Sequence, residues 1–425
     1  MQKEIEITSG GKVISRVIFG QELASVAEYL KGYDAIHMVC DGNVSPFAIA
    51  VAQAVTALDE DAREQHCNED GHHCCHEEGA EHHCHHEEGE EHHCCHEQGE
   101  EHHCHHEQGE EHHCCHGGGG CHRRKLLGGR IKSITGIRAT EAEKSMDTVT
   151  AICGRLLEEG ADRNSLVLAI GGGITTDLAG FAASIFKRGV RFAYIPTTLL
   201  AQVDAAIGGK TGVNYDGLKN MLGVIRQPEF TYICPEVLET LPRREFLCGA
   251  AEMLKSFIIK DEGNYAKAVS LLTDINNIDP DTITPEEAAR MHGTLGELIF
   301  EAAAVKAEIV GRDQFEAGER RNLNLGHTFA HAIEKLSGGS IAHGEAVAMG
   351  IIQASRLAES TALTSRLIAD FTACGLPTEC PYTLEQMAEA MSNDKKAEGD
   401  IIHFIVPTAI GSVTQLDLTI KGIMT

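Results

Sequence analysis

Two histidines set four residues apart are the first feature of this sequence that could do chemistry. His327 and His331 close the segment Asn-Leu-Asn-Leu-Gly-His-Thr-Phe-Ala-His, and this spacing places both side chains on one face of a helix. Such a pair can ligate one metal ion, or one imidazole can ligate while the other handles protons. A third histidine, His343, stands at an expected helix start. Each alone would be interpreted as a hydrogen-bonded structural residue, but three in two motifs favour a site.

A glycine triplet follows an apolar run and could bind a phosphate. Gly171-Gly172-Gly173 comes directly after residues 166–170 and opens a helical segment, with Asp177 in its first turn. Glycines let a pyrophosphate approach the backbone, and a helix N-terminus favours negative charge. A plain tight turn and a dipole-favoured surface acid are the simpler alternatives. Because Pro196-Thr197-Thr198 ends the next apolar run at the same expected sheet edge, the motifs together indicate a nucleotide site.

Amine and amide side chains gather in the segment that follows. Between residues 205 and 220 the chain carries Gly208-Gly209-Lys210, Asn214 and Lys219-Asn220. Positive charge, amides and flexible backbone in one stretch suit a phosphate or polyol ligand. Taken by itself, the stretch would be interpreted as a solvated, glycine-rich loop.

Strands and helices must position these groups, and in the first half of the chain they alternate. The hydrophobic pattern predicts strands at residues 35–40, 130–137, 166–170 and 191–195, and helices at 46–58, 144–157 and 176–186. This alternation is typical of an open, parallel, Rossmann-like α/β sheet. From about Arg243 amphipathic stretches dominate, which predicts a mainly α-helical C-terminal domain with helices at 286–310, 329–336, 344–361 and 365–374.

Residues 64–122 differ sharply from the rest of the chain. They hold 19 of the 25 His, 10 of the 16 Cys and 16 acidic residues, with no Lys or Arg, and so carry -16 of the formal charge of -27. The unit Glu-His-His-Cys-(Cys/His)-His-Glu-(Glu/Gln)-Gly-(Glu/Ala) recurs every ten residues. Such a segment cannot bury enough apolar surface to offset chain entropy, so we expect a disordered low-complexity insert in the N-terminal domain.

Three hypotheses stay open for this insert. Cys and His are good ligands for zinc, nickel and copper, so the favoured hypothesis is that it binds several additional metal ions. Its Cys-Cys and His-His pairs lack the Cys-x-x-Cys spacing of a zinc finger, which indicates loose, heterogeneous sites. The alternatives are a tandem expansion without function and redox sensing by neighbouring cysteines. The other six cysteines are scattered singly, and most should behave as small buried hydrophobes.

Composition argues against several classes of protein. There is no Trp, aromatic residues make up 5% of the chain and the net charge is -27, so basic and stacking surfaces for nucleic acid are not expected. No apolar run approaches the roughly 20 residues of a membrane span, and the charged N-terminus lacks the apolar stretch of a signal peptide. We therefore expect a cytoplasmic protein without nucleic-acid or membrane partners.

Six motifs together resemble the 3-dehydroquinate synthase family of sugar-phosphate cyclases. They occur in the family's order over nearly the whole chain outside 64–122: Gly-Gly-Gly-Ile-Thr-Thr-Asp-Leu-Ala-Gly-Phe, Ile-Pro-Thr-Thr-Leu-Leu-Ala-Gln-Val-Asp, Ile-Gly-Gly-Lys-Thr-Gly-Val-Asn, Gly-Ala-Ala-Glu-Met-Leu-Lys, Leu-Asn-Leu-Gly-His-Thr-Phe-Ala-His-Ala-Ile-Glu and His-Gly-Glu-Ala-Val-Ala-Met-Gly. The resemblance implies an NAD-binding α/β domain at 1–63 and 123–242, the insert at 64–122, a metal- and substrate-binding helical domain at 243–425, and a homodimer. One departure is Thr175-Thr176, where the family often carries a glycine.

The resemblance also implies two cofactors. A divalent metal, zinc by first expectation and cobalt as the alternative, would be held by Glu252, His327 and His343, which leaves positions open for substrate hydroxyls. NAD would be contacted by ten residues: Asp41, Asn43, Glu141, Lys144, Gly172, Gly173, Asp177, Thr197, Thr198 and Lys219.

The activity implied by the resemblance is the conversion of 3-deoxy-D-arabino-heptulosonate 7-phosphate to 3-dehydroquinate and phosphate, in the shikimate pathway to chorismate and the aromatic amino acids. It proceeds by oxidation with NAD, elimination of phosphate, reduction, ring opening and aldol closure, which makes the enzyme a carbon–oxygen lyase. Substrate contacts would come from Asp204, Asn220, Lys306, Arg320, Asn324, Lys395 and Lys396. Catalytic roles would fall to His331 and Glu316 for proton transfer and to Lys210 and Arg188 as cations at the substrate.

Three alternatives remain at this point. A related sugar-phosphate cyclase could act on a substrate without a carboxylate, but two cations, Arg320 and Lys306, fit a substrate acid. A polyol dehydrogenase of similar build would not need the phosphate-binding lysines. A metal-storage protein on an inherited enzyme scaffold would be expected to have lost some of the catalytic positions.

Overall fold

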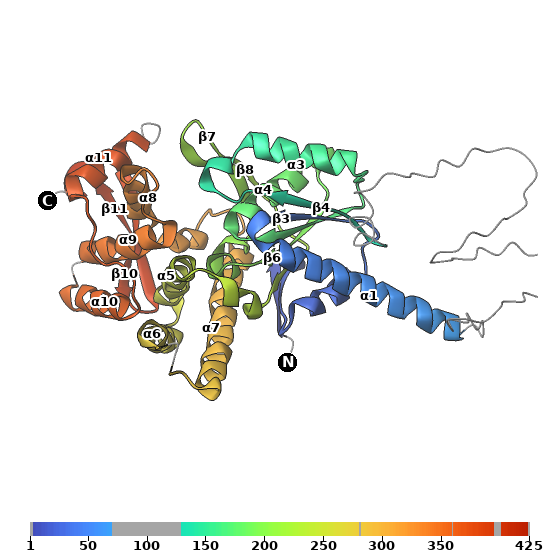
Figure 1. Ribbon diagram of the computed structural model, residues 1–425. Helices are drawn as coiled ribbons and strands as arrows, with labels where there is room; N and C mark the ends of the chain where they lie inside the picture. The colour runs from blue at the N-terminus through green and yellow to red at the C-terminus, as the bar shows by residue number, and fades with distance from the viewer. Residues whose placement is uncertain (1–2, 70–128, 280–281, 359, 395–400, 424–425) are drawn as a thin grey trace, which may run out of the picture.

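A seven-stranded sheet forms the centre of the N-terminal half (Figure 1). The computed structural model describes residues 3–69, 129–279, 282–358, 360–394 and 401–423. The sheet order is β1-β2-β9-β6-β5-β3-β4, and every neighbouring pair is parallel except β1 with β2. Its strands are β1 (Lys3–Ser9), β2 (Lys12–Phe19), β3 (Ile36–Asp41), β4 (Ile131–Ile137), β5 (Leu166–Gly171), β6 (Arg191–Pro196) and β9 (Phe230–Ile233). The four predicted strands are β3 to β6, each within one residue at either end.

Helices cover both faces of this sheet. Helix α1 (Ser45–Glu69) and the 3-10 helix η1 (Leu23–Leu30) lie on one face, and α3 (Met146–Glu158) and α4 (Gly173–Ile185) on the other. Met38 of β3 belongs to the first core and its neighbour Val39 to the second. Because the central strands β3, β5, β6 and β9 are buried on both faces, they appear in the sequence as continuous apolar runs.

Helix boundaries correct three of the predictions. Helix α4 begins at Gly173, three residues before the predicted start, so the glycine triplet itself forms its N-terminus. Helix α3 begins at Met146, because the Ser145 hydroxyl accepts a hydrogen bond from the Thr148 amide and caps it. Helix α1 runs on to Glu69, past residue 58 and into the segment predicted to be disordered, since residues 59–69 are rich in helix-forming Glu, Gln, Ala and Arg. The rest of the insert, from residue 70 to 122, lies outside the described residues.

The chain returns from α1 to the sheet through a braced connection. Arg130, just before β4, forms an ion pair with Asp59 of α1, with 2.6 Å between Nη2 and Oδ1, and donates a second hydrogen bond to the Leu30 carbonyl oxygen. Strand β4 starts beside the amino-terminal end of β3, where Ile131 pairs with Ile36. This connection therefore lies at the amino-terminal edge of the parallel strands.

The segment after β6 contains an antiparallel hairpin, although taken alone it would have been interpreted as a loop. Strands β7 (Lys210–Tyr215) and β8 (Leu218–Ile225) pair with each other, and β7 packs against α4. Lys210 stands at one end of the hairpin, while Lys219 and Asn220 stand near its turn. Two shorter elements, η5 (Ala201–Ala205) and η6 (Pro235–Thr240), flank the hairpin and β9 along the chain.

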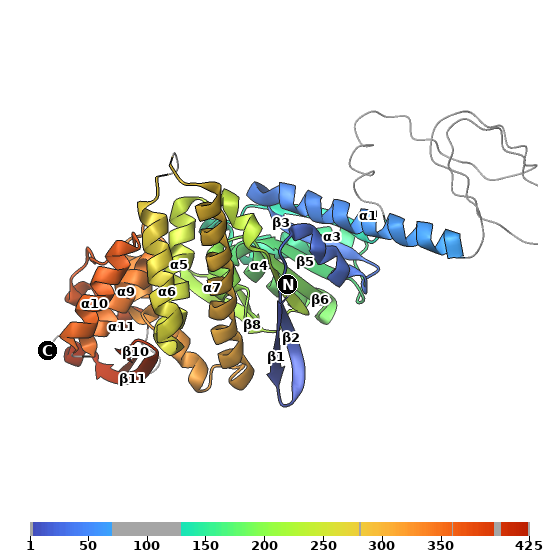
Figure 2. The ribbon, with the colours of Figure 1, turned by 90° about the horizontal axis from the view of Figure 1, so that it is seen from below.

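The C-terminal half is mainly helical, as predicted (Figures 1 and 2). It comprises α5 (Arg243–Lys260), α6 (Glu262–Asn277), α7 (Pro285–Arg312), η7 (Glu319–Asn324), α8 (His327–Leu336), α9 (His343–Leu357), α10 (Thr361–Ala373), α11 (Leu384–Asp394), the hairpin β10 (Ile401–Ala409) and β11 (Ser412–Thr419), and α12 (Ile420–Ile423). The prediction of one helix over 344–361 was wrong: α9 ends at Leu357, and the Ser360 hydroxyl caps α10 by accepting from the Leu363 amide. The β10–β11 hairpin was not predicted.

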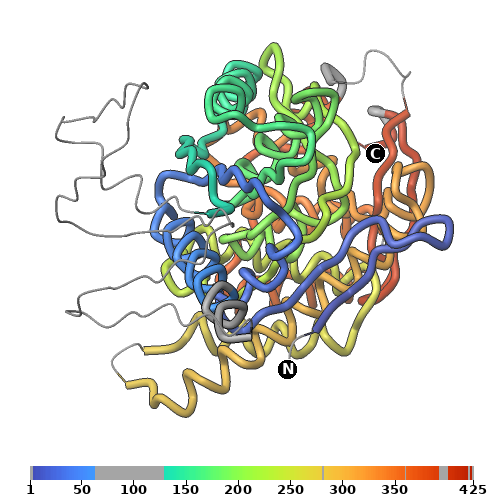
Figure 3. Tube along the Cα trace, turned by 90° about the vertical axis from the view of Figure 1, so that its right-hand side faces the viewer, coloured from blue at the N-terminus to red at the C-terminus, as the bar shows by residue number. Residues whose placement is uncertain are grey.

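Helix packing joins the two halves. Helices α5, α6 and α7 stand side by side next to the sheet, and the β1–β2 hairpin reaches out from the sheet along α7 (Figures 2 and 3). Helix α9 crosses α5 with its backbone very close at Gly344, where an added Cβ would lie 2.2 Å from the Cα of Cys248. Among the described residues, no helix is both long and apolar enough to cross a membrane.

Candidate active site

Three helices bring one carboxylate and two imidazoles together. Glu252 lies in the middle of α5, whereas His327 and His343 are the first residues of α8 and α9. The Glu252 Oε1 atom lies 3.6 Å from His327 Nε2 and 3.1 Å from His343 Nε2. One ligand atom from each residue lies within 4.8 Å of the others. The structure thus brings together the three residues for which the sequence analysis expected a metal ion.

The second nitrogen of each imidazole is already held by an acceptor. His327 Nδ1 lies 3.2 Å from the Leu325 carbonyl oxygen, and His343 Nδ1 lies 3.2 Å from Glu334 Oε1. With both Nδ1 atoms held by these acceptors, both Nε2 atoms face Glu252, which is the usual arrangement of metal-ligating histidines. Two imidazoles and one carboxylate form a zinc-type donor set with further positions open, so these residues fit a divalent ion.

The two histidines differ in their proton affinity. Burial, reinforced by the charge of Lys255, lowers the pKa of His327 to about 3, so this imidazole is neutral. Burial disfavours the charged form of His343 as well, but its hydrogen bonds to Glu252 and Glu334 raise its pKa to about 10. His331, one turn after His327 on α8, lies at the edge of the cluster, with its ring centroid 5.8 Å from that of His327.

A buried ion-pair network adjoins the histidine cluster. Lys255, only 1% exposed, contacts Glu252 Oε2 at 2.5 Å and Asp204 Oδ2 at 3.2 Å. Lys306 donates to the other Asp204 carboxylate oxygen and to the Asp204 carbonyl oxygen. Burial opposes ionisation of Asp204, but the charges of Lys255 and Lys306 hold its pKa well below the usual range. Burial also lowers the pKa of Lys306 to about 8, since desolvation outweighs the attraction of Asp204.

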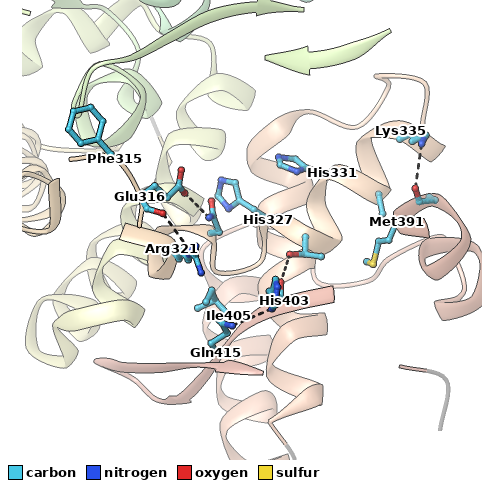
Figure 4. Close-up of a pocket in the computed structure, with 14 residues that line it drawn as sticks. Phe315, Glu316, Arg321, His327, His331, Lys335, Met391, His403, Ile405 and Gln415 are labelled. Atoms are coloured by element: carbon cyan, nitrogen blue, oxygen red, sulfur yellow. Dashed lines mark hydrogen bonds between the residues drawn. The ribbon is translucent and has the colours of Figure 1, made fainter. Parts of the chain in front are cut away.

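A second polar group lines a cavity beside His327 and His331. The cavity measures about 870 Å³, and Glu316, Asn324, His327 and His331 all line it (Figure 4). Glu316 Oε1 accepts a hydrogen bond from Asn324 at 2.8 Å, and Lys210 from β7 pairs with the other carboxylate oxygen. Burial disfavours its charge, but the bond from Lys210 lowers the pKa of Glu316. An ionised carboxylate here can accept a proton, and an adjacent ammonium can bind an anion.

Arg320 is positioned differently from the other cations. Its side chain is 1% exposed, and its guanidinium donates to the carbonyl oxygens of Gly208 and Gln314. It therefore holds the glycine turn before Lys210 against η7. The contact of Arg320 with the substrate carboxylate stays a prediction.

The carboxyl-terminal edge of the parallel sheet carries the expected nucleotide residues. The chain leaves β3 for the edge strand β4 and returns on the other side to β5, so the ends of β3 and β5 flank a topological switch point. At the end of β5, Gly172 caps the α4 N-terminus and packs closely on Thr198, since an added Cβ would lie 3.0 Å from Thr198 Cγ2. At the end of β3, the Asp41 carboxylate accepts from the Asn43 amide at 3.0 Å. This edge fits a dinucleotide pyrophosphate.

Polar contacts tie this edge to the β7–β8 hairpin. Lys144 donates to Asp177 and to Asn220, each at 2.6 Å, and Glu141 accepts from Asn214 at 2.8 Å. Thr197 is buried and its amide bonds to the Gly171 carbonyl oxygen. Desolvation raises the pKa of Asp177, although the charge of Lys144 opposes the shift.

The predicted site residue Arg188 is not joined to these clusters. Arg188 is exposed just before β6, at the opposite edge of the sheet from the glycines, and no contact links it to the site among the described residues. Lys395 and Lys396 lie outside the described residues. Lys219 donates to Glu334 of α8, with 2.9 Å between Nζ and Oε1, and its Nζ also lies 3.9 Å from Glu141 Oε1 near the glycine edge.

Two residues in the clusters were missed by the sequence analysis. Lys255 closes the Gly-Ala-Ala-Glu-Met-Leu-Lys motif three residues after Glu252, and Glu334 closes the motif that begins with Leu323. Helical spacing was the available signal, because 252 and 255, like 327, 331 and 334, share one helix face.

Comparison with known proteins agrees with this arrangement. Residues 134–248 match the family model described as 3-dehydroquinate synthase N-terminal, and residues 249–397 match 3-dehydroquinate synthase C-terminal. A 3-dehydroquinate synthase of Pyrococcus abyssi is 44% identical over 296 residues, which cover 69% of this chain and 84% of that protein.

Two solved structures share the fold. The 2-epi-5-epi-valiolone synthase of Streptomyces hygroscopicus, solved with NAD+ and Zn2+ bound, superposes with a TM-score of 0.70 at 24% identity, covering 99% of this chain and 97% of that one. A 2-deoxy-scyllo-inosose synthase complexed with carbaglucose-6-phosphate, NAD+ and Co2+ gives a TM-score of 0.67 at 19% identity, covering 99% and 98%.

Proposed function

Since the chain belongs to the 3-dehydroquinate synthase family and is an enzyme, we propose that it converts 3-deoxy-D-arabino-heptulosonate 7-phosphate to 3-dehydroquinate and phosphate. The reaction breaks a carbon–oxygen bond to phosphate, so the enzyme is a lyase. Its product is the carbocycle from which the shikimate pathway makes aromatic amino acids.

Two cofactors belong to this proposal. Glu252, His327 and His343 would hold a divalent ion, and Zn2+ or Co2+ accompanies NAD+ in the two structures of similar fold. Gly172, the α4 N-terminus and the residues around Asp177 would hold NAD. When bound, the ion would polarise a substrate hydroxyl oxygen, and the dinucleotide would accept and return one hydride.

The chain's own residues would bind the substrate and move its protons. Lys210, which pairs with Glu316 of the cavity wall, would attract the phosphate, and Lys306, which pairs with Asp204, would attract the carboxylate or a neighbouring hydroxyl. Glu316 is the proton acceptor that the geometry favours, since Lys210 and Asn324 keep it ionised and aimed at the cavity. His331 lines the same wall and would relay protons.

The observation that carries this proposal is the convergence of Glu252, His327 and His343 beside the Lys210–Glu316 pair. The test is release of inorganic phosphate from the sugar acid phosphate by the zinc-loaded protein with NAD below the substrate concentration. We expect many turnovers per NAD, because the hydride is returned. Lack of phosphate release after metal reconstitution would refute the proposal, and equal turnover of a sugar phosphate that lacks the carboxylate would refute the choice of substrate.

Several expectations from the sequence join the proposal. They are the division at residues 242 and 243 into cofactor and catalytic domains, a homodimer in the cytoplasm, and metal binding by the repeat insert at 64–122. Contacts of Arg188, Lys395 and Lys396 with the substrate are proposed on the resemblance alone.

A further inference from the structure

One buried carboxylate contacts both the metal cluster and the β7–β8 hairpin. Glu334 lies in the last turns of α8, and its side chain is 5% exposed. Its Oε1 atom accepts from Lys219 Nζ at 2.9 Å and lies 3.2 Å from His343 Nδ1. The proposed function assigns no role to this residue.

The two partners of Glu334 belong to different binding regions. His343 opens α9 and directs its other nitrogen at Glu252 in the metal cluster. Lys219 stands on β8, next to Asn220, which accepts from Lys144 at the glycine edge. Lys219 Nζ also lies 3.9 Å from Glu141, a second residue of that edge. The side chain of Glu334 therefore connects the predicted metal ligand His343 to the β7–β8 hairpin.

The bridge is tight because a single oxygen atom serves both partners. Glu334 Oε2 is buried and has no hydrogen-bond partner among the residues that the structure describes, so both bonds converge on Oε1. Burial of a carboxylate without partners costs free energy, so when the groups that neutralise it move, the carboxylate moves with them. Any movement that turns the His343 ring must therefore shift the oxygen that holds Lys219, and the reverse holds as well.

We propose that Glu334 is a positioning residue that couples metal binding to cofactor binding. An ion at the triad fixes the His343 ring, and the ring fixes Glu334 where it holds Lys219 and the hairpin in place for the dinucleotide. The dinucleotide orders the same carboxylate from the other side. Because each ligand orders a group that the other needs, the second to bind loses less conformational freedom, and the coupling is positive in both directions.

The test measures binding rather than turnover. Zinc affinity of the Glu252–His327–His343 site is determined by chelator competition on the full-length protein, as the binding that His327→Ala removes, without NAD and with NAD above the dissociation constant of each variant. NAD affinity is determined with and without zinc. For the wild-type protein we expect the zinc affinity to be at least about 5-fold higher with NAD present than without it. Zinc should raise the NAD affinity by the same factor. Glu334→Gln should reduce this factor to near one and lower zinc affinity by roughly 10-fold or more.

Three further variants separate coupling from a merely structural ion pair. Glu345→Gln removes a charge on the same turn as His343, but Glu345 pairs with Arg244 and not with the imidazole, so its coupling factor should match the wild type. Lys219→Met should lose the coupling, whereas Lys219→Arg, which keeps the charge, should retain it. Lys219 is 45% exposed, so this pair decides the question even if Glu334→Gln fails to fold.

Each outcome has one meaning. The inference rests on the proposed cofactors, so a wild-type protein that binds neither zinc nor NAD would refute the proposed function itself. A wild-type protein that binds both without coupling, or a Glu334→Gln or Lys219→Met variant that keeps the wild-type factor, would overturn the role of Glu334 and leave the proposed function intact.

Discussion

Gly344→Ala should disrupt the metal site through the backbone rather than through any ligand. Gly344 directly follows His343, and Cys248 precedes Glu252 by one helical turn, so the crossing of α9 and α5 sets the distance between two ligands. An added Cβ would lie 2.2 Å from the Cys248 Cα and 2.4 Å from its carbonyl oxygen. Carbon atoms in contact lie about 3.5 Å apart or more, so the helices must separate by roughly 1 Å.

The magnitude follows from that displacement. Overpacking of this kind costs about 3 kcal/mol when side chains can adjust, and here the neighbour is backbone, so we expect at least that loss in the free energy of unfolding. Metal-ligand distances tolerate about 0.2 Å, so the shift should also remove the zinc ion of the Glu252–His327–His343 site. The assays are urea denaturation followed by circular dichroism and zinc stoichiometry after dialysis.

A matched control is available on α7. Gly293 is also helical, but no atom lies within 4 Å of an added Cβ among the described residues, so Gly293→Ala should keep zinc binding and gain up to about 1 kcal/mol from helix propensity. If Gly344→Ala binds zinc with wild-type stoichiometry and unfolds at the wild-type urea concentration, the argument from helix spacing is wrong.

Three other predictions concern charge and metal. Burial lowers the pKa of Lys306 to about 8, so its positive charge is lost as the pH rises through that value. At pH values above about 8 the KM for the substrate should therefore increase. In Lys306→Arg, which stays charged, this increase should be absent. The unfolded chain keeps the Lys306 proton to about pH 10.4, so the contribution of this residue to the free energy of unfolding should increase across the same interval, measurable as a difference from Lys306→Met. His327→Ala should abolish activity and remove the zinc ion of the Glu252–His327–His343 site but leave NAD affinity within about 3-fold, and retained activity would refute the ligand role. Deletion of residues 65–122 should remove several zinc ions per chain without loss of turnover, whereas an unchanged stoichiometry of one ion would end the hypothesis of metal binding by the insert.

The sequence predicted strands β3 to β6 for a physical reason, whereas β1, β2 and β9 of the same sheet were not predicted. Strands β3, β5 and β6 are buried on both faces, so their apolar runs carry a strong signal, and glycine or proline ends each of β5 and β6. The resemblance, and not a local pattern, supplied Glu252 of the metal cluster. His327 and His343 each begin a helix, so their local patterns already placed them at element ends.

Other features depend on long-range contacts that no local pattern encodes. The hairpin β7–β8 was not predicted because β8 is exposed along nearly its whole length and shows little alternation. The contact between Lys219 and Glu334 was not predicted either, because the two residues lie 115 positions apart in the chain. The break between α9 and α10 depends on one serine cap at Ser360.

The Asp59–Arg130 brace has an evolutionary consequence. It fastens α1 at Asp59 to the start of β4, at the sheet edge opposite the cofactor and metal residues. Repeats gained or lost by unequal duplication between Asp59 and Arg130 therefore do not alter the catalytic edge. Selection for turnover does not act on the number of repeats. Close relatives of this chain should differ freely in repeat count while they keep Asp59 and Arg130, and the same point would accept a fused domain in an engineered protein.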